Sequence, residues 1–231
     1  MAEQSTESPI VLNVGITGHR AHMLGDRGKG ALKGVVDQVF RELRDATLKV
    51  QRKDASFSSA TPAELRLHTG LASGADQIAA RSARSSGYTV RALLPFSAED
   101  YRQDFEIGDE LDEFERALDA ADEVVALPGD RAAPEDAYVL VGKTMIEAAD
   151  VIVAIWDGQE GRGPGGTAHV VELARQSAVP VIHIDVDWSS DRISTRMLVG
   201  DKAIEPRRGS HLTPGSYYRL LRGALTAATA A

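Results

Sequence analysis

The chain contains VIVAIWDG at residues 151–158, an unbroken apolar run followed by an acidic turn. Such a run is typical of a parallel strand covered by helices on both faces, because a half-exposed strand would alternate polar and apolar residues. Shorter β-rich runs occur on both sides of it, at Val11–Ile16, Glu64–Thr69, Thr89–Leu94, Glu123–Leu127 and Val179–Ile184. Together with Val151–Trp156 they predict six strands.

Helical patterns separate the predicted strands. Between the first two, apolar residues recur at helical spacing from Leu32 to Leu43, as on one face of a long amphipathic helix. Further helices are predicted at Ala75–Ser86, Leu111–Ala121, Glu135–Ala149, Thr167–Ser177 and, after Thr213-Pro214, Gly215–Ala227. This order predicts a doubly wound α/β fold: a mainly parallel six-stranded sheet, helices on both faces and a C-terminal helical appendage.

The pattern divides the chain into three parts. We expect a disordered N-terminus at residues 1–10, one α/β domain at residues 11–187 and a C-terminal extension at residues 188–231. The extension is expected to be irregular until its final helix. The polar, serine-rich segment Gln51–Ala63 is predicted to be a long surface loop.

Composition excludes several classes of protein. The 231 residues include 26 Lys and Arg against 34 Asp and Glu, which gives a formal net charge of −8 and makes nucleic acid an unlikely partner. There is no cysteine, so disulfide scaffolds, cysteine-ligated metals and thiol catalysis are excluded. No secretory signal pattern and no apolar run of about 20 residues occurs, so we expect a cytoplasmic protein without a membrane partner.

Ligands of open α/β sheets bind beyond the carboxyl ends of the strands, where the winding reverses. The loop after the first predicted strand offers Thr17, Gly18, His19 and Arg20. There Gly18 can take a positive φ and let backbone N–H groups approach a ligand, and Arg20 can pair with a phosphate.

Two further loops have the composition of phosphate-binding turns. Their candidate ligand contacts are Gly70, Ser73, Gly74 and Asp76 after the second strand, and Gly158, Gly165, Gly166 and Thr167 after the fifth. A helix opening near Ser73 would direct free N–H groups at an anion. Asp76 is either a carboxylate that stabilises the helix dipole or an acceptor for a ribose hydroxyl, and Thr167 is either an N-cap or a direct ligand contact.

The convergence of three such loops on one edge of the sheet predicts a nucleotide-like ligand. Candidate catalytic groups are Asp157 and Glu172, and Glu172 is equally compatible with a solvated helix residue. No nucleophile elbow is present. His19 and His22 supply only two possible metal ligands, so neither a metal site nor a cofactor is predicted.

Several motifs resemble the SLOG superfamily, which includes the LOG phosphoribohydrolases and the DNA-processing protein A domain. The segment from His68 to Asp76, with Ala79-Ala80 and Gly87–Val90, is similar to the DNA-processing signature, and Gly165–Thr167 to a GGT-type phosphate loop. A bacterial SLOG group shares the remaining motifs, which are Thr17–Arg20, Leu94-Pro95-Phe96 with Tyr101 and Asp104-Phe105, and Ala149–Gly158. The resemblance implies a Rossmann-like fold over residues 11–187, recognition of nucleotides or their derivatives, and a homodimer or higher homo-oligomer.

The chain departs from the LOG pattern at one catalytic position. LOG hydrolases carry a glutamate three residues after the loop threonine, where this chain has Val170, and Glu172 lies two residues further on. The leading hypothesis is therefore binding or sensing of a nucleoside phosphate, an ADP-ribose-like compound or a cyclic nucleotide. One alternative is a nucleoside 5′-monophosphate phosphoribohydrolase that uses Glu172 or Asp157 as acid/base and Arg20 for the phosphate. A second alternative is single-stranded DNA binding, as in DNA-processing protein A.

Overall fold

The computed structural model describes residues 9–24, 29–58, 60–159, 161, 163–187, 190, 192–205 and 211–228. Its strands are β1 Val11–Gly18, β2 Glu64–Thr69, β3 Thr89–Leu94, β4 Glu123–Ala126, β5 Val151–Trp156, β6 Val181–Asp187, β7 Arg192–Val199 and β8 Lys202–Ile204. Its helices are α1 Lys29–Lys53, α2 Ala75–Ser85, α3 Ala98–Tyr101, α4 Asp109–Asp119, α5 Pro134–Ala148, α6 Thr167–Gln176 and α7 Pro214–Ala228, with short 3₁₀ turns at Ala21–Met23 and Arg102–Asp104. Most of the N-terminus that the sequence predicts to be disordered, residues 1–8, lies outside the described residues.

All the strands form one sheet in the order β4-β3-β2-β1-β5-β6-β7-β8. The six predicted strands are confirmed as β1 to β6, and these six pair with one another in parallel. The chain winds outward from β1 to β4, then crosses back to β5 and winds the other way. The winding therefore reverses between β1 and β5, which lie side by side near the middle of the sheet.

The predicted number of strands is wrong, because the described part of the sheet has eight. The segment expected to be irregular after Asp187 forms β7 and β8, which extend the sheet in antiparallel fashion. In β7 only Thr195 and Met197 are buried, whereas most residues of β5 are. A half-buried strand has a mixed sequence without an apolar run, and for that reason the pattern gave no signal for it.

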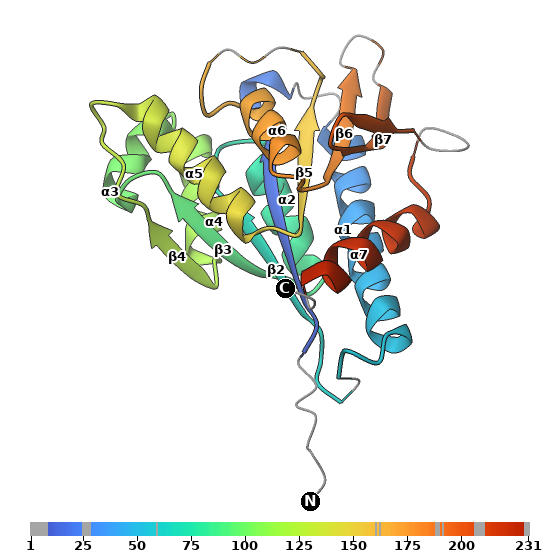
Figure 1. The fold of residues 1–231 in the computed structure, drawn as a ribbon. Helices are drawn as coiled ribbons and strands as arrows, with labels where there is room; N and C mark the ends of the chain where they lie inside the picture. Colours follow the sequence, from blue (N-terminus) through green and yellow to red (C-terminus); the bar gives the residue numbers. More distant parts are fainter. Residues whose placement is uncertain are drawn as a thin grey trace, which may run out of the picture.

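Helices cover both faces of the sheet (Figure 1). On one face, α5 and α6 pack against each other and against the central strands, around Met145, Ile152 and Val170. On the other face α1 contacts α2 and α7, and α2 contacts α4. In α7, Tyr217, Leu221 and Leu225 are buried in the hydrophobic core on this second face.

The segment Gln51–Ala63 is only partly the surface loop that its polarity predicts. Helix α1 continues to Lys53, and Gln51 is buried, with its side-chain amide donating hydrogen bonds of 2.7 Å to the carbonyl oxygens of Ser58 and Thr61. Phe57 is buried as well. The Gln51 amide thus provides hydrogen-bond donors for two carbonyl oxygens of a turn that composition alone would place in solvent. None of the described helices is both long and apolar enough to span a bilayer.

Candidate ligand-binding site

A cavity of about 540 Å³ opens at the carboxyl ends of β1 and β5, where the winding reverses. Helices α5 and α6 and the loops after β1, β2 and β5 enclose it. The predicted site residues that line it are Thr17, Gly18, His19, Arg20, Gly70, Asp76, Asp157, Gly165, Gly166 and Thr167. The structure thus brings together residues from all three predicted loops.

The other predicted site residues lie outside this lining. Ser73 is buried beside Glu110 of α4. Gly74, in the loop after β2, packs against the loop after β1. Gly158 has a φ of 78° and lies near Arg196, outside the cavity wall. Glu172 is exposed and accepts hydrogen bonds from Gln176 at 2.9 Å and Arg175 at 3.5 Å, so it contacts its own helix.

The loops after β1 and β2 are packed backbone against backbone. The amide of Ala75 donates a 3.0 Å hydrogen bond to the carbonyl of His19, and a Cβ placed on Gly74 would lie 2.5 Å from the amide nitrogen of Ala21. Gly18 does not take the positive φ that the sequence suggested. It is the last residue of β1, and a Cβ there would lie 2.5 Å from that of Ala75. These two glycines therefore permit close packing of the loops.

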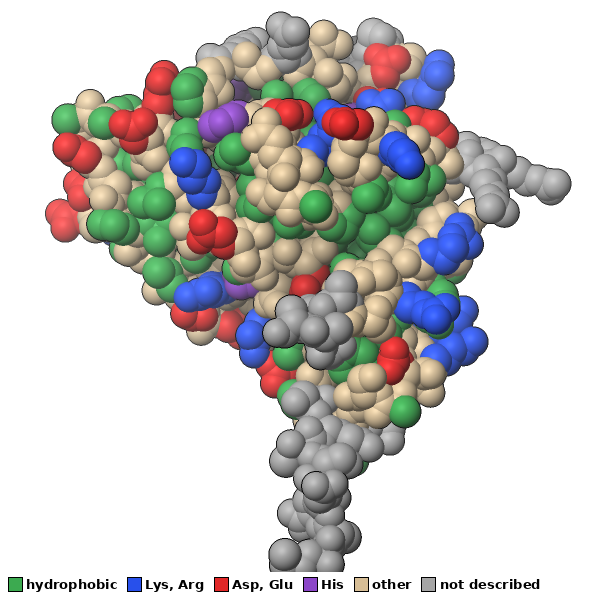
Figure 2. Space-filling view, in the orientation of Figure 1, with side chains coloured by type: hydrophobic (Ala, Val, Ile, Leu, Met, Phe, Trp, Pro, Cys, Tyr) green, Lys and Arg blue, Asp and Glu red, His purple; other side chains and the backbone are tan. Residues whose placement is uncertain are grey.

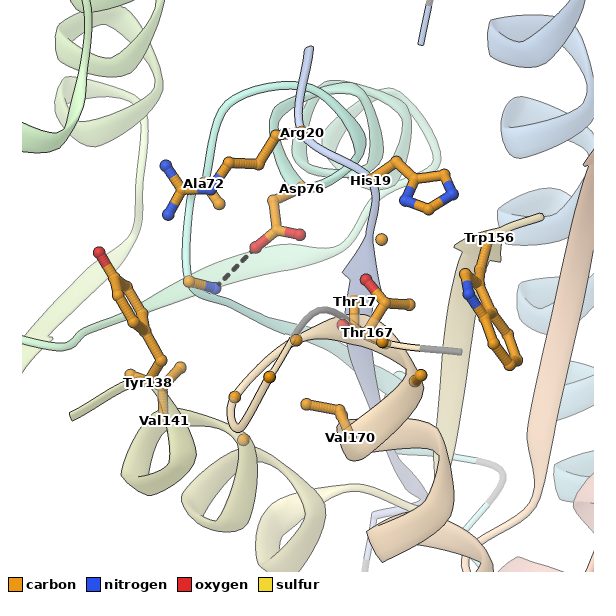
Figure 3. A pocket seen from close by; sticks show the side chains of 18 of the residues that line it. Thr17, His19, Arg20, Ala72, Asp76, Tyr138, Val141, Trp156, Thr167 and Val170 are labelled. Carbon is orange, nitrogen blue, oxygen red and sulfur yellow. Dashed lines mark hydrogen bonds between the residues drawn. The ribbon is translucent and has the colours of Figure 1, made fainter. Parts of the chain in front are cut away.

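Asp76 organises the loop in which it lies. Its Oδ2 accepts a hydrogen bond from the hydroxyl of Thr69 at 3.2 Å. It accepts another from the amide of Gly70 at 3.1 Å (Figure 3). Burial raises the pKa of Asp76 to about 6, although these hydrogen bonds and the charge of Arg20 act in the opposite direction. The carboxyl group is the acceptor for this turn, as well as a wall of the cavity.

Arg20 lies at one side of the cavity over the ring of Tyr138, with its guanidinium carbon 5.7 Å from the ring centroid. The Tyr138 hydroxyl donates a hydrogen bond to Asp104, and Arg131 donates another to the same carboxylate. Burial by itself would lower the pKa of Arg20, but Tyr101, Tyr138 and Asp104 outweigh it and raise that pKa. The positive charge of Arg20 is therefore retained at every physiological pH and is held in place by a network behind it.

His19 and Asp157 form a second polar pair in the cavity. The Nε2 of His19 is 3.1 Å from Oδ1 of Asp157 and 3.3 Å from its backbone nitrogen. A single ring nitrogen cannot accept from the amide and donate to the carboxylate at the same time. With a proton on Nε2 the ring donates to the Asp157 carboxylate, and without one it accepts from the Asp157 amide. The hydrogen bonding of this pair therefore changes with the position of the His19 proton.

The N-terminus of α6 faces the cavity without a side-chain cap. The N-cap is Gly166, and Thr167 is the first helical residue, so of the two roles considered for Thr167 that of N-cap is wrong. Gly165 has a φ of 77°, and a Cβ there would lie 2.6 Å from that of Tyr138, so only glycine lets this turn pack on α5. Uncapped N–H groups and the positive end of the helix dipole favour an anion here.

Sequence reasoning missed the walls contributed by α5 and by the end of β5. Tyr138, Val141 and Met145 line the cavity from α5, and Trp156 lines it from β5. Helix α5 itself was predicted, but its periodicity does not show which neighbour its faces meet. Among the described residues no group of three or more His, Asp or Glu side chains could hold a metal ion.

Comparison with known proteins identifies the fold. No protein-family model and no curated protein matches the chain. DNA processing protein A (DprA) from Streptococcus pneumoniae has a similar structure, with a TM-score of 0.50 and 15% identity over 78% of this chain and 53% of that one. The chain therefore has a fold similar to that of DprA. The resemblance to DNA-processing protein A expected from the sequence is thus confirmed for the fold, and the chain spans about half the length of DprA.

Two other solved structures are similar to this chain. The structural-genomics target TM1055 has a TM-score of 0.43 and 18% identity over 74% of this chain and 72% of its own. The molybdenum cofactor carrier protein from Chlamydomonas reinhardtii has a TM-score of 0.40 and 18% identity over 78% of this chain and 80% of its own. At such identities a likeness concerns the fold alone.

Proposed function

We propose that this chain binds a nucleotide or a nucleotide derivative in the cavity at the ends of β1 and β5, with a phosphate between Arg20 and the N-terminus of α6. The position of the cavity carries the proposal. It lies where the winding of the sheet reverses, which is where open α/β sheets bind their ligands. A fixed positive charge and an uncapped helix N-terminus border it there.

The size and chemistry of the cavity favour a nucleotide over a free phosphate. Its volume of about 540 Å³ falls within the range of small-molecule sites. Apolar side chains of Ile16, Val141, Met145 and Val170 line it together with the polar groups. A ligand that combines an anionic group with a less polar body matches both parts of this lining.

The two alternatives receive less support. For hydrolysis of the N-glycosidic bond, Glu172 lies outside the cavity. This leaves Asp157, paired with His19, as the predicted acid/base group inside it. For DNA binding, Figure 2 shows basic side chains mixed with acidic ones over most of the face in view, and a small group of basic side chains over α1 and α7. The chain also carries a net charge of −8, which opposes binding to a polyanion.

A thermal-shift panel tests the proposal with AMP, ADP-ribose, NAD, cyclic nucleotides and a short single-stranded DNA. A ligand at 100 times its Kd adds about 2.7 kcal/mol, a rise of roughly 5–10 °C for a chain of this size. Arg20→Gln should reduce the nucleotide shift, whereas Arg66→Gln, which removes an exposed arginine paired with Glu64, should leave it unchanged.

The same panel separates the alternatives. Free base that accumulates with time would establish hydrolysis, and Asp157→Asn and Glu172→Gln would then show which carboxylate is required. A response to DNA alone, or a nucleotide shift that Arg20→Gln leaves intact, would contradict the proposed site. The homodimer or higher homo-oligomer implied by the resemblance stays a prediction, which analytical ultracentrifugation tests.

A further inference from the structure

Two aromatic side chains stand on opposite sides of the cavity (Figure 3). Tyr138 is already engaged, because the guanidinium of Arg20 lies over its ring and its hydroxyl donates to Asp104. This side is the cationic end of the cavity. Trp156 stands on the other side, near His19, with Thr17 and Thr167 between the two rings.

One face of the Trp156 indole rests on protein. The imidazole of His183 lies against it, with ring centroids 5.2 Å apart and an angle of 31° between the ring planes. His183 belongs to β6, the neighbour of β5, so this face is turned away from the cavity. Trp156 is nevertheless half-exposed and lines the cavity, so the part of its indole that His183 does not cover borders the ligand space.

The imidazole behind Trp156 is held in one orientation and one tautomer. Its Nε2 is 2.8 Å from the carbonyl oxygen of Trp156, which can only accept, and its Nδ1 accepts a 3.0 Å hydrogen bond from Nε of Arg196. Burial lowers the pKa of His183, although the Trp156 carbonyl acts in the opposite direction. His183 is therefore neutral near pH 7, with its proton on Nε2.

Arg196 is fixed in turn by two carboxylates. It lies 3.6 Å from Asp185 of β6 and 3.9 Å from Glu205, which follows β8. The C-terminal extension thus supplies, through β7, the group that orients the imidazole. A ring held in advance loses little conformational entropy when a second ring stacks on it, so more of the stacking free energy is available for binding.

We propose that the free face of Trp156 is the stacking surface for the base of the ligand, and that His183 and Arg196 are positioning residues that hold this surface. The inference rests on the proposed function and narrows it. The ligand class is a nucleoside phosphate with an aromatic base, and a sugar phosphate would fill only the end near Arg20. The side chains of Asp157 and Gln159, which also line the cavity, lie in the neighbouring stretch of chain and supply polar groups for the edge of a base.

Paired probes test this inference: AMP and ribose 5-phosphate, which share the phosphate and ribose but differ in the base. The chain has two tryptophans, so Trp188→Phe leaves Trp156 as its only indole fluorophore. In that background AMP should quench the fluorescence and bind at least about tenfold more tightly than ribose 5-phosphate. Loss of one base-stacking side chain weakens binding by about 5-fold to 150-fold, so Trp156→Ala, followed by thermal shift, should remove most of this preference.

Variants with smaller changes separate stacking from general damage. Trp156→Phe keeps an aromatic face and should retain part of the preference for AMP. Arg196→Met should weaken AMP binding while leaving ribose 5-phosphate binding unchanged. Arg192→Met is the matched control, because it alters an exposed arginine at the start of the same strand.

The outcomes distinguish this inference from the proposed function. If both probes bind wild type equally well and Trp156→Ala changes neither affinity, the stacking surface is refuted while the phosphate site stands. If neither probe nor any other nucleotide stabilises the wild-type chain, the proposed function fails and the stacking surface fails with it. A selective loss of AMP binding in Trp156→Ala and Arg196→Met supports both.

Discussion

Replacing Gly74 by alanine should destabilise the chain and damage the site together. Gly74 has a φ of 91° and precedes α2. A Cβ there would lie 2.5 Å from the amide nitrogen of Ala21, 2.7 Å from the carbonyl carbon of Arg20 and 2.8 Å from the carbonyl oxygen of His19. All three are backbone atoms, so no side-chain rotation relieves the overlap, and the two loops must separate.

Two costs add up in this variant. An L residue in such a backbone conformation costs about 1–3 kcal/mol. Overpacking of a tightly packed interior typically costs another 1–3 kcal/mol or so. The expected loss of unfolding free energy is therefore about 2–6 kcal/mol, which lowers the Tm of a chain of this size by roughly 5–20 °C.

Gly87 provides a matched control. Its φ is 88°, close to that of Gly74, but a Cβ there would meet no atom within 4 Å. Gly87→Ala therefore carries a positive-φ cost without any overlap, and the extra loss of unfolding free energy in Gly74→Ala reports the overlap together with the ψ of −113° at Gly74. Chemical denaturation of both variants, together with thermal shifts in the presence of AMP, provides the data.

The variants should differ in ligand binding as well. The atoms displaced in Gly74→Ala belong to His19, Arg20 and Ala21, so the variant should bind AMP more weakly, whereas Gly87→Ala should bind it as wild type does. Equal stability losses in the two variants would refute the close approach of the loops. Unchanged AMP affinity in Gly74→Ala would refute the dependence of the Arg20 site on this packing.

Three further predictions concern stability. Burial raises the folded-state pKa of Asp76 to about 6 from its ordinary 3.8, so folding favours the protonated carboxyl, and this contribution is lost as the pH rises from about 4 to 6. Asp76→Asn should remove that loss, which amounts to roughly 3 kcal/mol at about 1.4 kcal/mol per pKa unit, in denaturation curves measured across this range. Burial, with the nearby charges of Arg91 and Arg66, lowers the pKa of His68 to about 4, so its contribution has the opposite sign and stability is lost as the pH falls from about 6.5 to 4. His68→Gln should lack that acid-side loss, and an unchanged pH profile would contradict the assignment. Removal of residues 188–231 should yield aggregated protein in size-exclusion chromatography, since β6 would become an apolar edge strand, and a soluble, folded monomer would contradict this expectation.

Burial on both faces explains which elements the sequence predicts. The central strands β1, β5 and β6 lie between two layers of helices, and their runs of apolar residues record that environment directly. The edge strand β4 has no fully buried residue, and its short run Glu123–Ala126 is recognised by its two valines instead. In β7 the burial of Thr195 depends on a partner far along the chain, since its Oγ1 accepts a 2.7 Å hydrogen bond from the amide of Leu212. A polar residue made buried by a distant contact carries no local signal.

The same reasoning separates the predicted site residues from the missed ones. Arg20, Gly70 and Gly165 belong to loops at strand ends, and the topology of parallel sheets brings such loops together. Composition shows that a loop is made of small residues, but not whether a given glycine faces a ligand or a neighbouring loop. Gly74 therefore resembles a phosphate contact in the sequence although it packs against backbone in the structure.

Strand β7 links the stability of the fold to the geometry of the site. It pairs with β6 along the whole strand, from Val181 opposite Leu198 to Asp187 opposite Arg192, and so covers the edge of an apolar strand. The same strand presents Arg196 to His183, whose imidazole supports Trp156 at the cavity wall. A change that loosens β7 therefore acts on the sheet edge and on the aromatic wall at once, whereas the Arg20 end of the cavity, built on β1, α5 and Asp104, is held independently of it. We therefore expect binding of the phosphate and binding of the base to depend on separate parts of the chain.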